Sequence, residues 1–301
     1  MHSTRLLPAL ALSALCTGPG FADDLTGTLK KIKEIGAITL GHRESSVPFS
    51  YYDDKQEVVG YAMDLCHRIV DGVKKELNLP NLEVKLNPVT SATRIPLIAN
   101  GTVDLECGST TNNLEREKQV AFTITHFVTA NRFVSKKSAD LKTVEDLRGK
   151  TITSTSGTTN IKQITEIGAQ KGLNLNIIPA KDHAEAFLMV ETGRAAAFVM
   201  DDILLYSLVA GSKSPATYVI SADALSVEPY GIMLRREDPA FKKVVDEAMI
   251  ATYRSGAING IYENWFLKPI PPKGINLNVP MSESFKKVVA SPTDSGDPAV
   301  Y

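Results

Sequence analysis

The sequence predicts an α/β protein made of two lobes that are joined by two extended segments. Short apolar runs typical of strands alternate with amphipathic helical patterns from residue 25 to residue 121, which favours a mostly parallel sheet with helices on both faces. The same alternation restarts at residue 141 and continues to residue 202, so a second α/β unit follows the first. Residues 127–135 and 226–234 would carry the chain to the second unit and back, and two such crossings permit rigid-body closure.

In the first unit, helices are predicted where apolar residues recur at helical spacing, and strands where short apolar runs stand between turn residues. The predicted elements are, in order, a helix over 25–35, a strand over 37–41, a helix over 60–77, a strand over 83–86, a helix that carries Arg94, and a strand from Val103. Thr90 and Ser91 are expected to cap the helix that carries Arg94.

The second unit repeats this alternation, and the chain then returns to the first. The predicted elements are a helical turn over 141–149, a strand over 150–154, a helix over 160–170, a strand over 174–179, a helix over 183–191, a strand over 196–200 and a helix over 203–210. Asp202 is expected to cap the last helix. The returning segment is predicted as one strand over 230–235, followed by helices over 240–255 and 258–266 and a proline-rich surface tail over 269–301.

The first 22 residues have the composition of an export signal. Arg5 is their only charged residue, an apolar core follows it, and small residues stand at 20 and 22. Cleavage is expected before Asp23, and the apolar run is shorter than the roughly 20 residues needed to span a bilayer. The mature chain would carry 32 basic and 34 acidic residues, a balance that argues against a nucleic-acid partner.

Cys66 and Cys107 remain after removal of the signal. In an exported protein two cysteines can form a disulfide, but the sequence does not place their Cα atoms within bonding reach. A disulfide and two buried thiols therefore both stay open.

The segment from Glu106 to Arg116 predicts an anion-binding site. It follows a strand and is expected to lead into a helix that carries Arg116 about one turn from its start, so that backbone N–H groups, the hydroxyls of Ser109 and Thr111, and a guanidinium converge. A guanidinium can hold a carboxylate by two parallel hydrogen bonds. The alternative is a polar loop with a surface arginine.

The second unit offers a similar arrangement. Residues 155–159 follow a strand and open a helix, so Thr159 could cap a carboxylate that Arg116 holds from the first unit. Asp201 ends an apolar strand, where an acid suits an ammonium group, and together these groups would bind the backbone end of an α-amino acid. The alternatives are an ordinary helix cap at each position.

Arg43, Arg94 and His183 each start or follow an element at the same predicted edge of a sheet. A second anionic group on the ligand would explain why several cationic or ionisable side chains gather there. The alternative is that each is a solvated surface residue.

The sequence gives little indication of a catalytic site. Ser156, His183 and Asp201 could form a hydrolase triad, but the G-x-S-x-G elbow is absent. Metal-ligand spacings, phosphate loops and dinucleotide motifs are absent as well, so no cofactor is expected. The chemistry points to binding.

Several long segments closely resemble the periplasmic glutamate/aspartate-binding proteins of amino-acid ABC transporters, within solute-binding protein family 3. They are residues 41–53, 106–113, 155–159, 180–183, 200–202 and 270–273. The resemblance extends over essentially the whole mature chain. It implies a type II periplasmic-binding-protein fold, with lobe 1 formed by residues 23–129 and 228–301, lobe 2 by residues 130–227, and a hinge of two strands.

The resemblance also implies a role for each candidate residue. Arg116 and Thr111 would hold the α-carboxylate of the ligand, with Thr159 closing on it, and Ser109 and Asp201 would take the α-ammonium group. The groups implied around the side-chain carboxylate are Arg43, Ser91, Arg94 and His183. The pocket would then offer three arginines against Asp201. This chain departs from the family in one point. The family pattern has a cysteine at the position of Ile232 and none at the position of Cys66, so the resemblance does not imply a disulfide in this chain.

The expected function is that of a monomeric periplasmic receptor without a cofactor, which captures L-glutamate or L-aspartate and delivers it to a membrane permease of an ABC transporter. One methylene distinguishes the two acids and is worth about 1–3 kcal/mol at most, so the sequence does not rank them. The alternative is an exported enzyme on the same fold, of the cyclic-acid dehydratase type, with Asp201 as its general acid.

Overall fold

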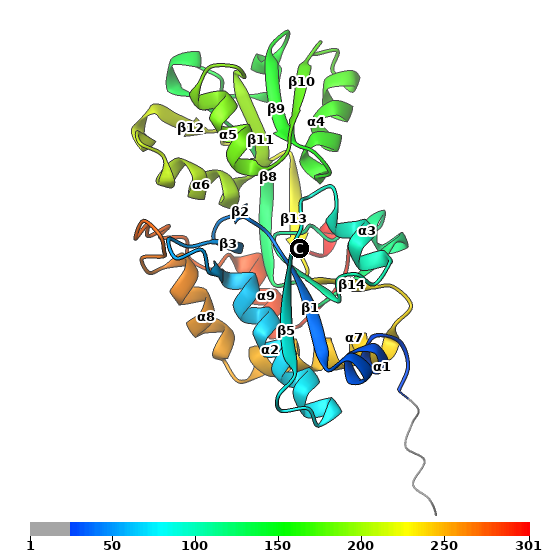
Figure 1. Ribbon diagram of the computed structural model, residues 1–301. Helices are drawn as coiled ribbons and strands as arrows, with labels where there is room; N and C mark the ends of the chain where they lie inside the picture. Colours follow the sequence, from blue (N-terminus) through cyan, green and yellow to red (C-terminus); the bar gives the residue numbers. More distant parts are fainter. Residues whose placement is uncertain (1–24) are drawn as a thin grey trace, which may run out of the picture.

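The computed structural model describes residues 25–301, which form two lobes (Figure 1). The first lobe is built on a five-stranded sheet with the order β5-β1-β6-β14-β7, and the second on a sheet with the order β10-β9-β11-β8-β12, to which β13 adds by pairing with β8. The predicted α/β fold class is confirmed. The predicted signal peptide, residues 1–22, lies outside the described residues. Within the described residues, none of the helices combines the length and hydropathy needed to cross a membrane.

The sheet of the first lobe combines segments that are far apart in the sequence. Strand β1 (Ala37–His42) runs parallel to both its neighbours, β5 (Glu83–Pro88) and β6 (Leu105–Cys107). Strand β14 (Met233–Arg235) runs antiparallel to β6 and to β7 (Val120–Phe122). The helices of this lobe are α1 (Gly27–Ile35), α2 (Tyr61–Leu77), α3 (Arg94–Ala99), α7 (Pro239–Arg254), α8 (Ala257–Phe266) and α9 (Glu283–Ala290).

In the second lobe, β9 is parallel to β10 and β11, whereas β8 is antiparallel to β11, β12 and β13. The strands are β8 (Phe127–Lys136), β9 (Thr151–Thr155), β10 (Asn176–Ala180), β11 (Ala197–Asp201), β12 (Tyr218–Ile220) and β13 (Ser226–Tyr230), and the helices are α4 (Thr159–Gln170), α5 (His183–Glu191) and α6 (Asp202–Gly211). The 3₁₀ turns are η2 (Lys137–Ala139), η3 (Val144–Leu147) and η4 (Pro215–Thr217) in this lobe, and η5 (Pro298–Val300) near the chain end. Figure 1 shows β8 and β13 running side by side from one lobe to the other.

The returning segment is not the single strand that the sequence predicts. β13 pairs with β8, while β14, after Gly231 and Ile232, pairs with β6 and β7 of the other sheet. The chain changes sheets at this point, and the apolar pattern continues through the change because both sheets bury it. The sequence also missed the small sheet of β2 (Ser45–Ser46), β3 (Ser50–Tyr52) and β4 (Val58–Val59), and strand β12, which are too short for a periodic signal.

The C-terminal segment is not a plain surface tail. It contains α9, whose Phe285 and Val288 are buried against the first lobe. Ser282 caps this helix by accepting from the backbone N–H of Phe285 at 3.2 Å. Apolar residues at positions three apart bury one side of the helix, and this short amphipathic pattern was overlooked among the prolines.

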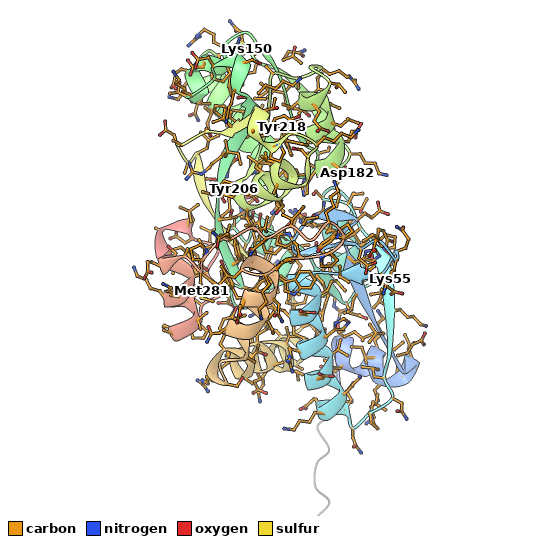
Figure 2. All side chains as sticks on the ribbon, turned by 90° about the vertical axis from the view of Figure 1, so that its left-hand side faces the viewer. Lys55, Lys150, Asp182, Tyr206, Tyr218 and Met281 are labelled. Carbon is orange, nitrogen blue, oxygen red and sulfur yellow. A yellow bond between two sulfur atoms is a disulfide. The ribbon has the colours of Figure 1, made fainter. Side chains whose placement is uncertain are left out.

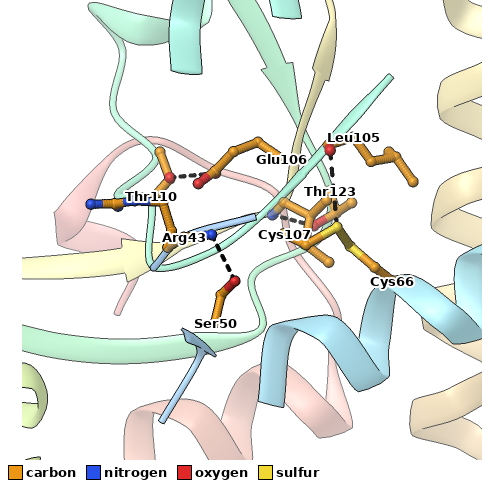
Figure 3. Close-up of a disulfide and its surroundings, with 9 residues drawn as sticks. Arg43, Ser50, Cys66, Leu105, Glu106, Cys107, Thr110 and Thr123 are labelled. Carbon is orange, nitrogen blue, oxygen red and sulfur yellow. Dashed lines mark hydrogen bonds between the residues drawn. A yellow bond between two sulfur atoms is a disulfide. The ribbon is translucent and has the colours of Figure 1, made fainter. Parts of the chain in front are cut away.

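Cys66 of α2 and Cys107 of β6 form a disulfide, which the sequence left open. Both side chains are fully buried. Figure 3 shows Cys107 directed toward α2, away from Glu106, its neighbour on the strand. The bond therefore ties the helix to the sheet. Ile232 lies directly before β14 and makes no such link.

Candidate functional site

The nine predicted site residues lie at the boundary of the two lobes. Eight of them are buried and Thr159 is half-buried. The two lobes touch here. Arg116 Nη2 of the first lobe donates to the carbonyl oxygen of Gly157 in the second at 3.2 Å. The backbone of Gly157 also lies so close to Ala92 of the first lobe that a Cβ added to the glycine would be 2.6 Å from the Cα of Ala92. The lobes are thus closed over these residues.

Arg43 and Arg94 come from two elements of the first lobe. Arg43 directly follows β1, where its Nη2 donates to Ser91 Oγ at 2.9 Å and its backbone N–H donates to Ser50 Oγ at 2.8 Å. Arg94 is the first residue of α3, and its Nη1 donates to the carbonyl oxygen of Ser109 at 3.2 Å and to Thr110 Oγ1.

Ser91 does not cap α3 as the sequence predicted. The N-cap is Thr93, which forms no capping bond with its side chain, and Thr90 Oγ1 accepts from the backbone N–H of Thr93 at 3.2 Å. The hydroxyl of Ser91 is instead the acceptor for Arg43. Ser91 therefore orients the guanidinium of Arg43 and does not cap the helix.

Arg116 begins a 3₁₀ turn, η1 (Arg116–Lys118), and does not lie one turn inside an α-helix as expected. The preceding loop is fixed to the crossing strand, because the backbone N–H of Asn112 donates to the carbonyl oxygen of Pro229 at 2.7 Å and Thr111 forms a bridge to Tyr230. The loop is thereby held extended. Arg116 Nη1 donates to the carbonyl oxygen of Thr111 at 2.8 Å. An anion here would meet a guanidinium rather than a helix N-terminus.

The second lobe contributes Thr159 and His183 from the first positions of two helices. Thr158 caps α4, and Thr159 Oγ1 donates to Glu228 Oε2 at 3.0 Å. Asp182 caps α5, which places His183 so that its Nδ1 lies 2.8 Å from Thr155 Oγ1.

Asp201 ends β11 and is held from two sides. Its Oδ1 accepts from Asn160 Nδ2 at 2.7 Å and its Oδ2 accepts from the hydroxyl of Tyr230. Asp202 does not cap α6 as predicted. Its carboxylate accepts from Thr129 Oγ1 and Arg132 Nε, because both side chains lie on the neighbouring strand β8.

Four buried polar atoms of the predicted site have no hydrogen-bond partner within the described residues. They are Arg43 Nη1, Arg94 Nε, Ser109 Oγ and His183 Nε2. They belong to four different segments, which the fold brings together. Leaving a buried donor unsatisfied costs about 1–3 kcal/mol, and more for charged groups. The two guanidinium nitrogens can only donate, so the set fits a ligand with an anionic group.

The electrostatics of the site also favour an anion. Burial, followed by repulsion from Arg94, lowers the pKa of Arg43 to about 10 and that of Arg116 to about 9. Burial and the charges of Arg43 and Arg94 hold the pKa of His183 well below its usual range, so its imidazole is neutral. Burial and the nearby Glu228 raise the pKa of Asp201 to about 7.

The sequence analysis missed two buried carboxylates at the site. Glu106 is fully buried, with Oε1 lying 3.8 Å from Arg94 Nη1. Glu228 on β13 is 1% exposed and accepts from Thr159 and from Gln163 Nε2 at 2.7 Å. The three arginines therefore face three carboxylates, not Asp201 alone. For Glu106, the sequence did offer a signal. An acidic residue inside an apolar run typical of a strand is expected to be buried, and a buried acid needs a charged or hydrogen-bonding partner.

The roles of Asn160 and Tyr230 were missed as well. Both hold Asp201, yet they lie on separate segments of the chain, so no local pattern connects them. In the part of the chain that the structure describes, no group of three or more His, Cys, Asp and Glu side chains is placed to hold a metal ion.

Two α/β lobes closed over a buried polar site define the class of solute-binding proteins. Residues 38–268 match the family of bacterial extracellular solute-binding proteins, family 3, and the chain belongs to this family. The predicted resemblance is thereby confirmed.

Particular relatives are similar over nearly the whole chain. The L-glutamate/L-aspartate-binding protein of Pseudomonas aeruginosa is 55% identical, with 96% of each chain covered. The glutamate/aspartate import solute-binding protein of Escherichia coli is 47% identical, covering 95% of this chain and 97% of the relative. Among solved structures, a mutant of ArgBP from T. maritima matches with a TM-score of 0.70 at 28% identity, covering 79% of this chain and 99% of that one.

Proposed function

We propose that the protein captures L-glutamate or L-aspartate between its lobes and delivers it to the membrane permease of an ABC transporter. The carrying observation is the set of buried polar atoms on Arg43, Arg94, Ser109 and His183 that have no hydrogen-bond partner within the described residues. The names of the relatives in Pseudomonas aeruginosa and Escherichia coli support the same ligands. Neither the site geometry nor the names of the relatives rank glutamate and aspartate, which differ by one methylene.

At the backbone end of the ligand, Arg116, Thr111 and Thr159 would bind the α-carboxylate. Thr159 donates to Glu228 in this structure, so its hydroxyl would exchange this acceptor for the ligand. Asp201 and Ser109 would take the α-ammonium group. An ionised carboxylate has about four lone-pair positions, so Asp201 can accept from an ammonium group while it keeps Asn160 and Tyr230.

At the other end, Arg43, Ser91, Arg94 and His183 would surround the side-chain carboxylate. His183 is neutral, so one ring nitrogen accepts and the other donates. Its Nδ1 lies 2.8 Å from the hydroxyl of Thr155. If that hydroxyl donates, the proton of the ring stays on Nε2, the free atom, and can be donated to the ligand.

The wider setting belongs to the same proposal. Lobe 1, residues 23–129 and 228–301, would close against lobe 2, residues 130–227, by rotation about β8 and β13. The protein would work as a monomer in the periplasm after removal of residues 1–22. No nucleic acid or cofactor takes part.

Calorimetry with L-glutamate, L-aspartate and L-glutamine tests the proposal. The wild-type protein should bind both acids and reject glutamine, because a neutral side chain leaves a buried arginine without its anion, a cost of several kcal/mol. Arg116→Ala should weaken all binding, by about 3–5 kcal/mol. Arg94→Ala should mainly reduce the preference for acidic over neutral side chains. A wild-type protein that binds neither acid would refute the proposal, and unchanged affinity in Arg116→Ala would refute the carboxylate contact.

The alternative of an exported enzyme has one point in its favour, because the pKa of Asp201, raised to about 7, suits a general acid. The curated relatives, however, are named for binding and import, so the expectation of a protein that is not an enzyme is confirmed. Ligand recovered chemically unchanged after incubation would agree with this, and a new product would not.

A further inference from the structure

Glu106 is a buried carboxylate that the proposed ligand contacts do not use. It is the central residue of β6 and is fully buried. Its Oε2 accepts from Thr110 Oγ1 at 2.6 Å, and the same Thr110 oxygen accepts from Arg94 Nη1. Its Oε1 has no hydrogen-bond partner within the described residues and lies 3.8 Å from Arg94 Nη1. Figure 3 shows the Glu106 side chain directed toward Thr110, with Arg43 beside them.

The chain makes room for this carboxylate at Gly108. A Cβ at this position would lie 2.4 Å from Glu106 Oε1 and 3.0 Å from Cγ of Arg43. A glycine therefore lets the carboxylate and the stem of Arg43 approach the same point. The charge of Glu106 acts on both arginines, since it favours the charged form of Arg43 and of Arg94.

Asp201 and Arg116 also interact with Arg94, but their opposite charges offset each other. The remaining charged groups near the two arginines add little at this end. His183 is neutral, and Asp182 is half-exposed at the lobe boundary, where solvent screens it (Figure 2). Glu228 acts on Arg116 and Asp201 instead. Two guanidinium groups and one carboxylate leave a net charge of +1 around the free atoms Arg43 Nη1 and Arg94 Nε.

We propose that Glu106 is a specificity-determining residue, which fixes this end of the site at a single positive charge so that it takes a singly charged acidic side chain and rejects a doubly charged one. The inference rests on the proposed function, because it concerns the subsite for the ligand side chain. Without Glu106, two buried arginines would face the ligand uncompensated and would favour a dianion.

The test uses two ligands of the same shape and different charge. L-homocysteate ends in a singly charged sulfonate, and the phosphonate of the same chain length is doubly charged in alkaline buffer. Both have the glutamate backbone, so contacts at Arg116 and Asp201 cancel in the ratio of their affinities. Displacement of glutamate should show that the wild-type protein prefers the sulfonate. Glu106→Gln should shift the ratio toward the phosphonate on the order of tenfold to a hundredfold.

Two variants control for the change of charge. Glu115→Gln removes an exposed carboxylate from the same loop and should leave the ratio and the glutamate affinity unchanged. Glu228→Gln removes a buried carboxylate at the opposite end of the site and should shift the ratio much less than Glu106→Gln. A Glu106→Gln protein that binds glutamate with the wild-type ratio would overturn the proposal. So would failure of both analogues to displace glutamate, because size rather than charge would then select the ligand.

A second measurement uses only the wild-type protein, so it tests the single positive charge of the subsite even if Glu106→Gln does not fold. Calorimetry of the wild-type protein in buffers of different ionisation enthalpy counts the protons that accompany binding. The phosphonate should take up about one proton more than the sulfonate, since the subsite accepts one negative charge. Equal proton counts would overturn the proposal. A wild-type protein that binds neither glutamate nor aspartate would instead refute the proposed function.

Discussion

Asp201 faces two opposing demands. Burial and Glu228 raise its pKa to about 7, although Tyr230 and Asn160 both donate hydrogen bonds to its ionised form. An α-ammonium group, by contrast, requires the carboxylate. Below the pKa of the free site, ligand binding must therefore expel a proton from Asp201.

We expect the affinity for glutamate to fall about tenfold between pH 8 and pH 6. His183 stays neutral over this window, since its pKa is held well below its usual range, and the ligand carboxylates stay ionised. Calorimetry over this pH range measures the effect. Asp201→Asn should bind weakly with little dependence on pH. A wild-type affinity that rises as pH falls would contradict the assignment.

The individual site residues show where sequence reasoning reached its limit. Arg43, Arg94 and Arg116 could be named from the sequence because each lies close to the start or end of a predicted element, where ligand-binding groups collect. Glu106 and Glu228 could not, because their importance lies in which side chain they face, and Glu228 meets Thr159 across 69 positions of the sequence. Contacts of that separation carry no local pattern.

Helix α2 and strand β6 are joined by the disulfide of Cys66 and Cys107, which closes a loop with a sequence separation of 41. Cross-linking a loop of this length restricts the unfolded chain, and the chain-entropy relation gives about 4 kcal/mol. We expect a reducing agent to lower the free energy of unfolding in urea by about 2–4 kcal/mol.

The variant with both Cys66→Ala and Cys107→Ala provides the control. It should be as unstable without the reducing agent as the wild-type protein is with it, and the reducing agent should not affect it further. An unfolding midpoint of the wild-type protein that does not move under reduction would contradict the predicted contribution.

Among the secondary-structure elements, long ones were predicted well and short ones were not. α2, α5, α7 and β8 have enough residues for their period to show, and their predicted bounds agree closely with the structure. β2, β3, β4 and the turn that starts at Arg116 span two or three residues each. Their conformation depends on contacts with distant segments. The loop before Arg116, for example, is fixed by the hydrogen bond from the backbone N–H of Asn112 to the carbonyl oxygen of Pro229.

Closure of the two lobes depends on Gly157. Its φ of 78° lies in the left-handed region, and a Cβ would lie 2.7 Å from the carbonyl oxygen of Ser91 and 2.6 Å from the Cα of Ala92 in the other lobe. Gly157→Ala should therefore keep the lobes from closing fully, and we expect the glutamate affinity to fall at least about tenfold.

Gly193 offers a matched control for this prediction. It has a φ of 77° in the same lobe, but a Cβ there would meet nothing within 4 Å. Gly193→Ala should share the backbone strain, about 1 kcal/mol of stability, and leave the affinity unchanged. Calorimetry and thermal unfolding of both variants separate the two effects. Equal affinities of the two variants would show that Gly157 does not limit closure.

The sequence by itself determined the α/β class, the restart of the pattern in a second unit, and the arginines, hydroxyls and acid expected at the boundary. Periodicity and chemical type are local properties, so a single chain displays them. The tertiary structure alone decided that β13 and β14 belong to different sheets, that Cys107 bonds to Cys66, and that Glu106 faces Arg94. These outcomes depend on packing between distant segments, where burial and charge balance select one partner among many that the sequence allows.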